Sequence, residues 1–279
     1  MELGSSGKSR PTLIAFVLGI ALLASSCASS GINKGQFNMI SLSEEVEAGR
    51  MYSQRIEKEL KVLRLQVLEE YVELLGQRIA RNSDQTDIIY HFKVIENDQV
   101  NAFTLPGGFI YVHTGLIEAC KTEAQLASVL AHEIGHVAAR HWAETVSLQT
   151  GLETISSIVV QILGVPRVWQ QQALQLAIGL GFMAYSRSQE AEADRLGARY
   201  LANTGYNPRG MVEMFEILQA QHDKEPSRFS AIFASHPLTS DRIVQARREI
   251  QHLPPPEGPD KPIVNTPQFS IIKSYFVKD

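Results

Sequence analysis

The chain has 279 residues, 44% of them hydrophobic and 20% charged, and its formal net charge is −4 at pH 7. This length allows one domain or two. The mildly acidic balance gives no reason to expect a nucleic-acid partner, because proteins that bind nucleic acids usually carry a marked excess of positive charge.

The N-terminal segment is predicted to be a targeting signal and not part of a fold. Lys8 and Arg10 precede an apolar run from Leu13 to Leu23, and small residues follow it. This order predicts a signal peptide over residues 1–26. The apolar run is much shorter than the roughly twenty residues that a membrane-spanning helix needs.

The signal-like segment ends in Leu23-Ala24-Ser25-Ser26-Cys27, which resembles the bacterial lipobox that precedes a lipidated cysteine. The resemblance implies a lipid on Cys27, with residues 27–43 as a polar tether to a membrane. Ala28 stands where inner-membrane lipoproteins would have aspartate, so the outer membrane is favoured. The alternative is a secreted protein that is cut near Ala28.

The next elements in the chain are predicted from periodicity. Residues 44–81 are expected to be helical, with an apolar stripe formed by Leu68, Val72, Leu75 and Ile79. Residues 88–95 alternate as a strand whose apolar side carries Ile88, Tyr90, Phe92 and Val94. Two more strands, 100–104 and 109–113, are joined through Pro106-Gly107-Gly108. We therefore expect an α+β fold that is mostly helical and has a small antiparallel-type sheet.

The helix that follows carries the most informative motif. Thr122 and Gln125 form a capping-box signature at its start. Its later residues read His132-Glu133-Ile134-Gly135-His136. The two histidines are four apart and share a face, so they can bind one zinc ion, and Glu133 can take a proton from a zinc-bound water. The alternative is a pair of histidines that merely decorate a surface helix.

A catalytic zinc site needs a third protein ligand, and a second helical segment offers one. Glu190 and Asp194 are four residues apart and share a face. Small residues at the same spacing would let the two helices approach closely, namely Ala131, Gly135 and Ala139 on the first helix and Ala193 and Gly197 on the second. We expect Glu190 to bind the metal and Asp194 to accept the free ring N–H of a ligand histidine. The alternative is a solvated acidic face.

Two nearby residues are alternatives to these candidates. Glu192 points about 200° around the helix from Glu190, at about 100° per residue, and ranks second as the ligand. His141 is nine residues after His132, which places it about 180° around an unbroken helix. We expect His141 to support the site or to lie at the surface, and not to bind the metal.

The segment 151–184 is strongly apolar and is interrupted by Gly164-Val165-Pro166. We expect a helical hairpin that forms part of the core and a lid beside the cleft, with membrane-surface or partner contact as the alternative. If Cys27 is lipidated, Cys120 is the one thiol that remains. It cannot form an internal disulfide and is expected to be a small buried residue.

The C-terminal third is predicted to contain two further helices. Asn207-Pro208 is a favourable start for a helix that runs to about residue 221. A loop with His236-Pro237 precedes a helix over 240–252, which three consecutive prolines end. The tail over 253–279 is expected to add a strand or to remain loose.

The two metal-binding segments resemble the gluzincin metallopeptidases of the CAAX-prenyl-protease, HtpX and Oma group. Further matching segments, in the order of the family, are Asn101-Ala102-Phe103-x-Leu105-Pro106-Gly107-Gly108, Gly115-Leu116-Ile117 and His236-Pro237-Leu238-Thr239-Ser240-Asp241-Arg242. Together they cover roughly residues 45–250. The subgroup that the chain resembles is the soluble bacterial LoiP and BepA type, without its tetratricopeptide array, because the tail is shorter than one repeat of about 34 residues.

The resemblance implies a zincin-like metallopeptidase domain over 44–252 with one zinc ion per chain. It implies that the enzyme is an endopeptidase acting on unfolded or misassembled proteins of the bacterial envelope, at the periplasmic face. It adds His236 and Arg242 as candidate catalytic residues that could stabilise the oxyanion. His236 could instead bind zinc in a resting state or support the loop. The rival class is a non-catalytic lipoprotein assembly factor or chaperone with a structural zinc.

Overall fold

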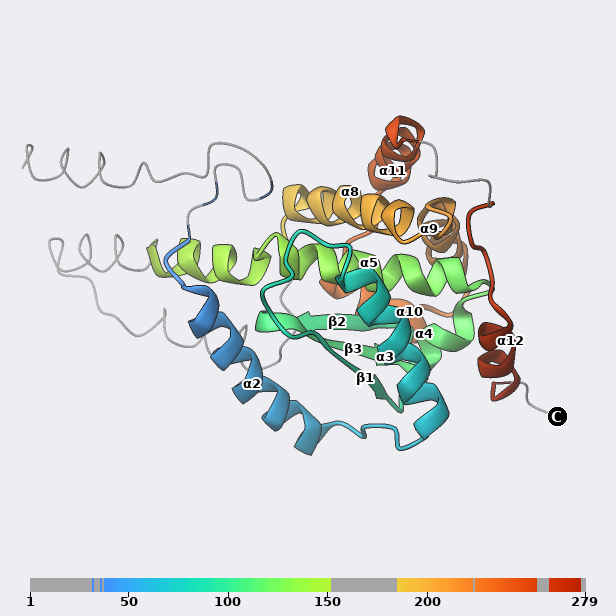
Figure 1. Cartoon of the computed structure of the whole chain (residues 1–279), viewed down its shortest axis with the longest axis horizontal. Coiled ribbons are helices and arrows are strands. Elements are labelled where there is room, and N and C mark those ends of the chain that lie inside the picture. Colours follow the sequence, from blue (N-terminus) through green and yellow to red (C-terminus); the bar gives the residue numbers. More distant parts are fainter. Residues whose placement is uncertain are drawn as a thin grey trace, which may run out of the picture.

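The computed structural model describes residues 32, 36, 38–151, 185–222, 224–254 and 261–276. The predicted signal peptide, Cys27 and nearly all of the apolar segment 151–184 lie outside these residues. Figure 1 shows the described part, in which a small sheet lies beneath a long central helix. No helix within the described ranges is long and apolar enough to cross a membrane.

The sheet has three strands in the order β1-β3-β2, with β1 at His91–Ile95, β2 at Ala102–Leu105 and β3 at Phe109–His113. β2 and β3 pair antiparallel through the short turn η1 (Pro106–Gly108), as expected. β1 pairs parallel with β3, so the sheet is mixed and not wholly antiparallel. The chain reverses direction twice between β1 and β3, and both strands therefore run the same way.

Successive side chains of the strands face opposite sides of the sheet. Phe92, Val94, Ile110 and Val112 belong to the main core, which lies beneath α3 (Gln66–Ala80) and α5 (Glu123–Ala138). Phe103, Leu105 and Tyr111 form a second cluster on the other side, with Tyr52 and Ile56 of α2 (Leu42–Glu59). The strand predicted over 88–95 begins only at His91. Tyr90, Phe92 and Val94 are buried in the main core as predicted, and Ile88 packs half-buried against it.

The predicted helix over 44–81 is in fact two helices. α2 ends at Glu59 and α3 begins at Gln66. Between them Leu63 N donates to Val94 O, and Val62 forms a bridge with Ile95. This extended link pairs with the edge of β1, so a tertiary contact overrides the local helical pattern. The apolar stripe of α3 is buried as predicted.

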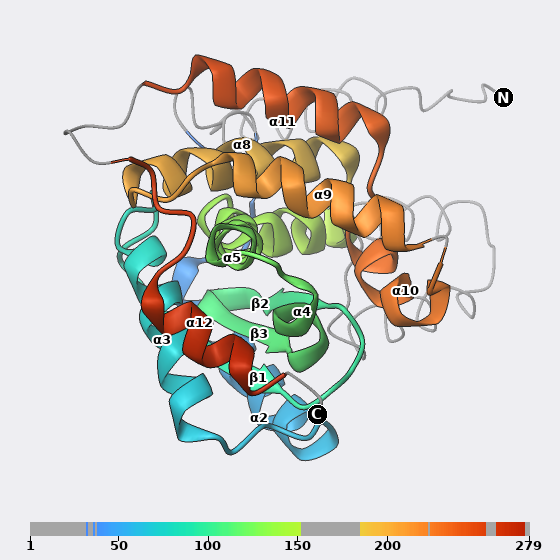
Figure 2. The ribbon, with the colours of Figure 1, turned by 90° about the vertical axis from the view of Figure 1, so that its right-hand side faces the viewer.

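The helices α5, α8, α9 and α11 stack in layers above the sheet. Figure 2 shows α5 directly over the strands, then α8 (Arg187–Asn203) and α9 (Arg209–His222), and then α11 (Ser240–His252). The predicted helices at about 207–221 and 240–252 are confirmed as α9 and α11. Two short helices were not predicted, α4 (Thr114–Ala119) and α10 (Pro226–Ser235).

The described part of the C-terminal tail is neither a strand nor loose. It contains α12 (Pro267–Ser274), which packs against α3 and buries Phe269 and Ile272 in the main core. Thr266 caps the helix, and Pro267 occupies its first turn, where its missing N–H is tolerated. Cys120 is a free, fully buried thiol, as expected.

Candidate active site

The site is built first on α5, whose every residue is buried. Thr122 and Gln125 form the predicted capping box at its start. His132 and His136 lie one turn apart near its C-terminal end, and Glu133 is 1% exposed beside them. A buried helix of this kind can hold polar groups only if they meet partners, because unpaired buried polar atoms are costly.

Those partners come from α8, which crosses α5 closely. A Cβ added to Gly135 would lie 2.9 Å from Ala193 O, and one added to Gly197 would lie 3.0 Å from His132 N. The predicted small-residue crossing is therefore confirmed at both glycines. Such close backbones allow the short side chains of Glu190 and Asp194 to reach the histidines of α5.

Four side chains converge at the crossing: His132, His136, Glu190 and His236. His136 Nε2 lies 3.0 Å from His132 Nε2 and 3.4 Å from Glu190 Oε1. His236 Nδ1, from the loop after α10, lies 3.0 Å from Glu190 Oε1 and 3.3 Å from His132 Nε2. A tetrahedral ion with ligand bonds of about 2.0–2.1 Å would separate its ligand atoms by about 3.3–3.4 Å. These pairs of atoms lie close to this separation, and all four atoms lie within 4.8 Å of one another, so the group could hold one zinc ion.

The charges of the cluster also fit a divalent cation. Glu133, Glu190 and Asp194 are buried, and Arg242 is the one buried arginine or lysine among the described residues. Burial by itself lowers the pKa of His132, but hydrogen bonds and charges of Asp194 and Glu190 raise it to about 10. When the histidines are neutral, as metal ligands must be, three ionised carboxylates facing one guanidinium leave two negative charges, which a zinc ion would balance.

Asp194 and Arg242 hold the cluster in place. Asp194 Oδ1 lies 2.9 Å from His132 Nδ1, which is the contact expected of a carboxylate that fixes a ligand histidine. Arg242 donates from Nε and Nη2 to the two oxygens of Asp194, both at 2.8 Å. Its Nη1 lies 2.7 Å from Glu190 Oε2 and 3.1 Å from Pro237 O. The guanidinium is thus fully engaged with the carboxylates and with the loop that bears His236.

Glu133 lies next to the cluster but outside the set of converging atoms. Its Oε1 is 3.4 Å from His236 Nε2, and its buried Oε2 accepts no hydrogen bond within the described part of the chain. Burial raises the pKa of Glu133, although His236 and His132 act in the opposite direction. A buried carboxylate with a raised pKa and a free oxygen is suited to accept and return a proton.

His141 and Glu192 also lie at the site, although neither contacts the converging ligand atoms. His141 Nδ1 is 2.8 Å from His136 Nδ1, and His141 Nε2 is 3.4 Å from Glu192 Oε2. His141 is fully buried and contacts His136, so of the two places expected for it the surface is wrong. The position of about 180° around the helix that was predicted for His141 is wrong. Arg140 has a φ of +54° and interrupts the helix before His141.

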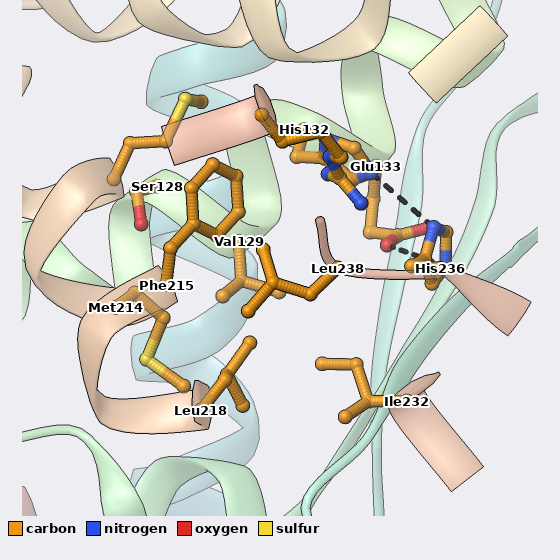
Figure 3. A pocket seen from close by; sticks show the side chains of 12 residues that line it. Ser128, Val129, His132, Glu133, Met214, Phe215, Leu218, Ile232, His236 and Leu238 are labelled. Carbon is orange, nitrogen blue, oxygen red and sulfur yellow. Dashed lines mark hydrogen bonds and ion pairs between the residues drawn. The ribbon is translucent and has the colours of Figure 1, made fainter. Parts of the chain in front are cut away.

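An apolar pocket opens beside Glu133 and His236, with a cavity volume of about 30 Å³. Figure 3 shows Val129 of α5, Phe215 and Leu218 of α9, and Ile232 and Leu238 around it. The carboxylate of Glu133 and the ring of His236 lie at one end. Sequence reasoning did not predict this pocket, because its walls come from four helices and a loop.

A histidine pair on one buried helix, with a carboxylate from a crossing helix and a glutamate beside them, defines a zincin-type metallopeptidase site. The model of peptidase family M48 matches residues 66–250, and this chain belongs to that family. The zinc of that family agrees with the cluster of four converging side chains.

The chain is similar to bacterial proteases and to a mitochondrial metalloendopeptidase. The beta-barrel assembly-enhancing protease of Escherichia coli (strain K12) is 29% identical over 226 residues, which cover 77% of this chain and 46% of the relative. The mitochondrial metalloendopeptidase OMA1 of Schizosaccharomyces pombe is 31% identical over 62% of this chain and 50% of its own length. The metalloprotease LoiP of Escherichia coli is 31% identical over 56% of this chain and 61% of its own length. This chain therefore spans about half the length of the first two.

Proposed function

We propose that this chain is a zinc-dependent endopeptidase in which Glu133 is the general base. Zinc, when held by His132, His136 and Glu190, lowers the pKa of water and polarises the peptide carbonyl. Glu133 accepts a proton from the attacking water and returns it to the leaving amine. The observation that carries this proposal is the buried Glu133 carboxylate, with one free oxygen within the described residues, beside the four converging side chains.

The substrate is proposed to be an extended polypeptide. β2 is an edge strand of the described sheet and packs near α5, which supports pairing with a substrate strand along Asn101–Leu105. The narrow apolar pocket beside Glu133 supports binding of a small apolar substrate side chain next to the scissile bond. These two features together favour segments that are unfolded and partly apolar.

His236 is proposed to close the site in a resting state. Its Nδ1 lies 3.0 Å from Glu190 Oε1 and 3.3 Å from His132 Nε2, as two ligand atoms of one ion would, whereas a catalytic zinc keeps one position for water or substrate. Activity would then require His236 to leave that position. After this movement, His236 or a neighbouring group would stabilise the oxyanion. Arg242 is proposed to act indirectly, by holding Asp194, Glu190 and the loop that bears His236.

A second candidate function is a non-catalytic assembly factor with a structural zinc. The four protein side chains at ligand spacing favour this reading, because structural zinc sites are closed by four protein ligands. The buried Glu133 argues against it, since a structural site has no need of a base.

The biological setting proposed is the bacterial cell envelope. The beta-barrel assembly-enhancing protease of Escherichia coli supports substrates among misassembled envelope proteins. The lipobox-like segment at Cys27 supports a periplasmic lipoprotein, anchored in the outer membrane by its N-terminal lipid.

The test is cleavage of an unfolded protein such as casein by the zinc-loaded full chain. Glu133→Gln should lower the rate by about 10²–10⁴-fold, because it removes the base and none of the proposed ligands. Its zinc content should equal that of the wild type. Glu70→Gln, the same change at an exposed position on α3, is the matched control and should cleave normally.

His236→Ala separates latency from lack of activity. Cleavage that rises in this variant and disappears again in His236→Ala/Glu133→Gln would support a closed peptidase. Unchanged cleavage in Glu133→Gln alone would refute the role of the base. Silence of both wild type and His236→Ala, with zinc fully bound, would favour the assembly factor.

A further inference from the structure

A row of side chains leads from His136 away from the metal cluster towards the surface of α8. His141 is fully buried between His136 and Glu192, whereas Glu192 is partly exposed. The His141 ring also lies near Tyr185, which stacks on His136 with ring centroids 4.0 Å apart. Neither His141 nor Glu192 takes part in the proposed hydrolysis. Any influence of these two side chains on the metal site must therefore act through the contact with His136.

The hydrogen positions along this row follow from the proposed ligand role of His136. A histidine that presents the lone pair of Nε2 to a metal carries its proton on Nδ1. His136 Nδ1 therefore donates, and His141 Nδ1, at 2.8 Å, accepts. His141 then carries its proton on Nε2, which lies 3.4 Å from the Glu192 carboxylate. Each donor meets an acceptor in this one arrangement.

The backbone is shaped to bring His141 to this position. Five residues of unbroken helix would place His141 about 140° around the axis from His136. The left-handed conformation of Arg140, at φ +54°, ends that helix and redirects the next one, which starts at His141. Arg140 Nε donates to Glu45 Oε2 at 2.9 Å, and Nη2 donates to Ile40 O at 2.6 Å. An unfavourable conformation at a non-glycine residue persists only where the surroundings hold it.

We propose that His141 and Glu192 are positioning residues for the metal ligand His136. His141 accepts the Nδ1 proton of His136, and Glu192 holds His141 in the tautomer that can do so. The inference rests on the proposed function only in treating His136 as a ligand. Asp194 supports His132 directly with a carboxylate, whereas the carboxylate that supports His136 acts through one additional ring. The hydrogen bond from His141 also lowers the pKa of Glu192, which keeps this acceptor ionised.

The test is the zinc dissociation constant of the purified full chain, measured by competition with a chromogenic chelator. His141→Phe keeps a ring at this place but accepts no hydrogen bond, and it should weaken zinc binding by about 10–100-fold. Glu192→Ala should weaken binding less, and Glu192→Gln, whose amide oxygen still accepts, should recover part of that loss. The visible absorption of cobalt(II)-loaded His141→Phe should differ from that of the wild type, because the orientation of a ligand ring has changed.

Arg195→Ala is the matched control, because Arg195 is the other charged partner of Glu192, at 3.3 Å. It should bind zinc as the wild type does, and the melting temperatures of the zinc-free variants report on the fold. Wild-type zinc affinity in His141→Phe overturns the inference. If that variant does not fold, wild-type affinity in Glu192→Ala overturns it, as does an equal loss in Arg195→Ala.

His136→Ala separates this inference from the proposed function. If His136→Ala binds zinc with wild-type affinity, the ligand assignment fails and the inference fails with it. If His136→Ala loses zinc while His141→Phe does not, the ligand assignment stands and only the positioning role of His141 is refuted.

Discussion

At the scale of single residues, the site is a balance between buried charges of opposite sign. Burial by itself raises the pKa of Glu190, but His236, His132 and His136 hold it below its usual value. Burial also raises the pKa of Asp194, but the hydrogen bonds and charge of Arg242 hold that pKa below its usual value. Arg242 is itself only 6% exposed. Removal of one member of such a network leaves its partner charged and buried, which is strongly destabilising. Variants that keep size and change only charge are therefore the most informative.

A matched pair of substitutions on α8 separates a ligand from its support. Asp194→Asn should weaken zinc binding by about 10–100-fold, because Asp194 acts through the ring of His132. Glu190→Gln should cause a larger loss of zinc, since a neutral amide oxygen replaces a carboxylate at ligand distance from His132 and His136. Equilibrium dialysis against buffered zinc measures both. Glu190 would not be a ligand if its variant held zinc more tightly than Asp194→Asn.

At the scale of elements, the crossing of α5 and α8 decides whether the ligands can meet. α5 contributes the two histidines and Glu133, and α8 contributes Glu190 and Asp194 from its first two turns. The start of α8 is fixed by the capping box of Ser186 and Gln189. Each helix is thus regular by itself, and their close approach brings the acidic side chains to the histidines.

Gly135→Ala tests this crossing by the sign of its effect. Alanine in place of glycine within a helix normally stabilises a protein by roughly 0.5–1 kcal/mol. Here the new Cβ would lie 2.9 Å from the backbone oxygen of Ala193, so the helices must move apart. We expect a lower melting temperature and weaker zinc binding. A variant that melts higher and keeps its zinc would show that the crossing tolerates a wider spacing.

The pocket between α5, α9 and α10 predicts a preference for substrate side chains. Leu238→Ala should enlarge the cavity and improve cleavage of peptides with a larger apolar residue beside the scissile bond. One methylene in such a pocket changes kcat/KM by about 10–200-fold. Competing peptides analysed by mass spectrometry give the ratio directly. Val244→Ala, which shortens an exposed apolar residue on α11, should leave the ratio unchanged; an unchanged ratio in Leu238→Ala would remove the pocket from substrate recognition.

At the scale of the whole molecule, segments far apart in sequence enclose the site. The N-terminal residues before α2 contact the helical segment after α5, where Met39 N donates to Ser147 Oγ at 2.8 Å. The C-terminal segment also belongs to this assembly, because Tyr206 forms a bridge with Ile263, and α12 closes the core beside α3. Met39, at the start of the described domain, therefore lies against the helical segment that follows the site-bearing helix α5.

The predicted lipid anchor is tested by Cys27→Ser. In a bacterial host the wild-type chain should incorporate a labelled fatty acid and sediment with membranes, because a diacylated cysteine provides stable attachment. Cys27→Ser should lose the label and appear in the soluble fraction. Cys120→Ser, which alters the buried thiol, should keep both properties. A wild-type protein without label, and with its N-terminus elsewhere, would refute the anchor.

Local sequence patterns were sufficient for the parts of the fold that depend on local chemistry. The capping box at Thr122, the stripe of α3 and the spacing of His132 and His136 are properties of one helix each. Gly135 and Gly197 also predicted the close crossing of the two helices, because two backbones can approach closely only where neither helix has a side chain. Glu190 was preferred to Glu192 because of the helix face it occupies, and Glu190 is the one of the two that lies among the four converging side chains.

Other features depended on contacts between segments distant in sequence. The break between α2 and α3 arises because residues 62–63 pair with β1. The tail is helical because Phe269 and Ile272 find a core to fill. His141 reaches His136 because Arg140 is held in a left-handed conformation by Glu45 and Ile40, 95 and 100 residues earlier in the chain. Periodicity assumes an unbroken helix, and only the tertiary structure determines where a helix breaks and what the next side chain then meets.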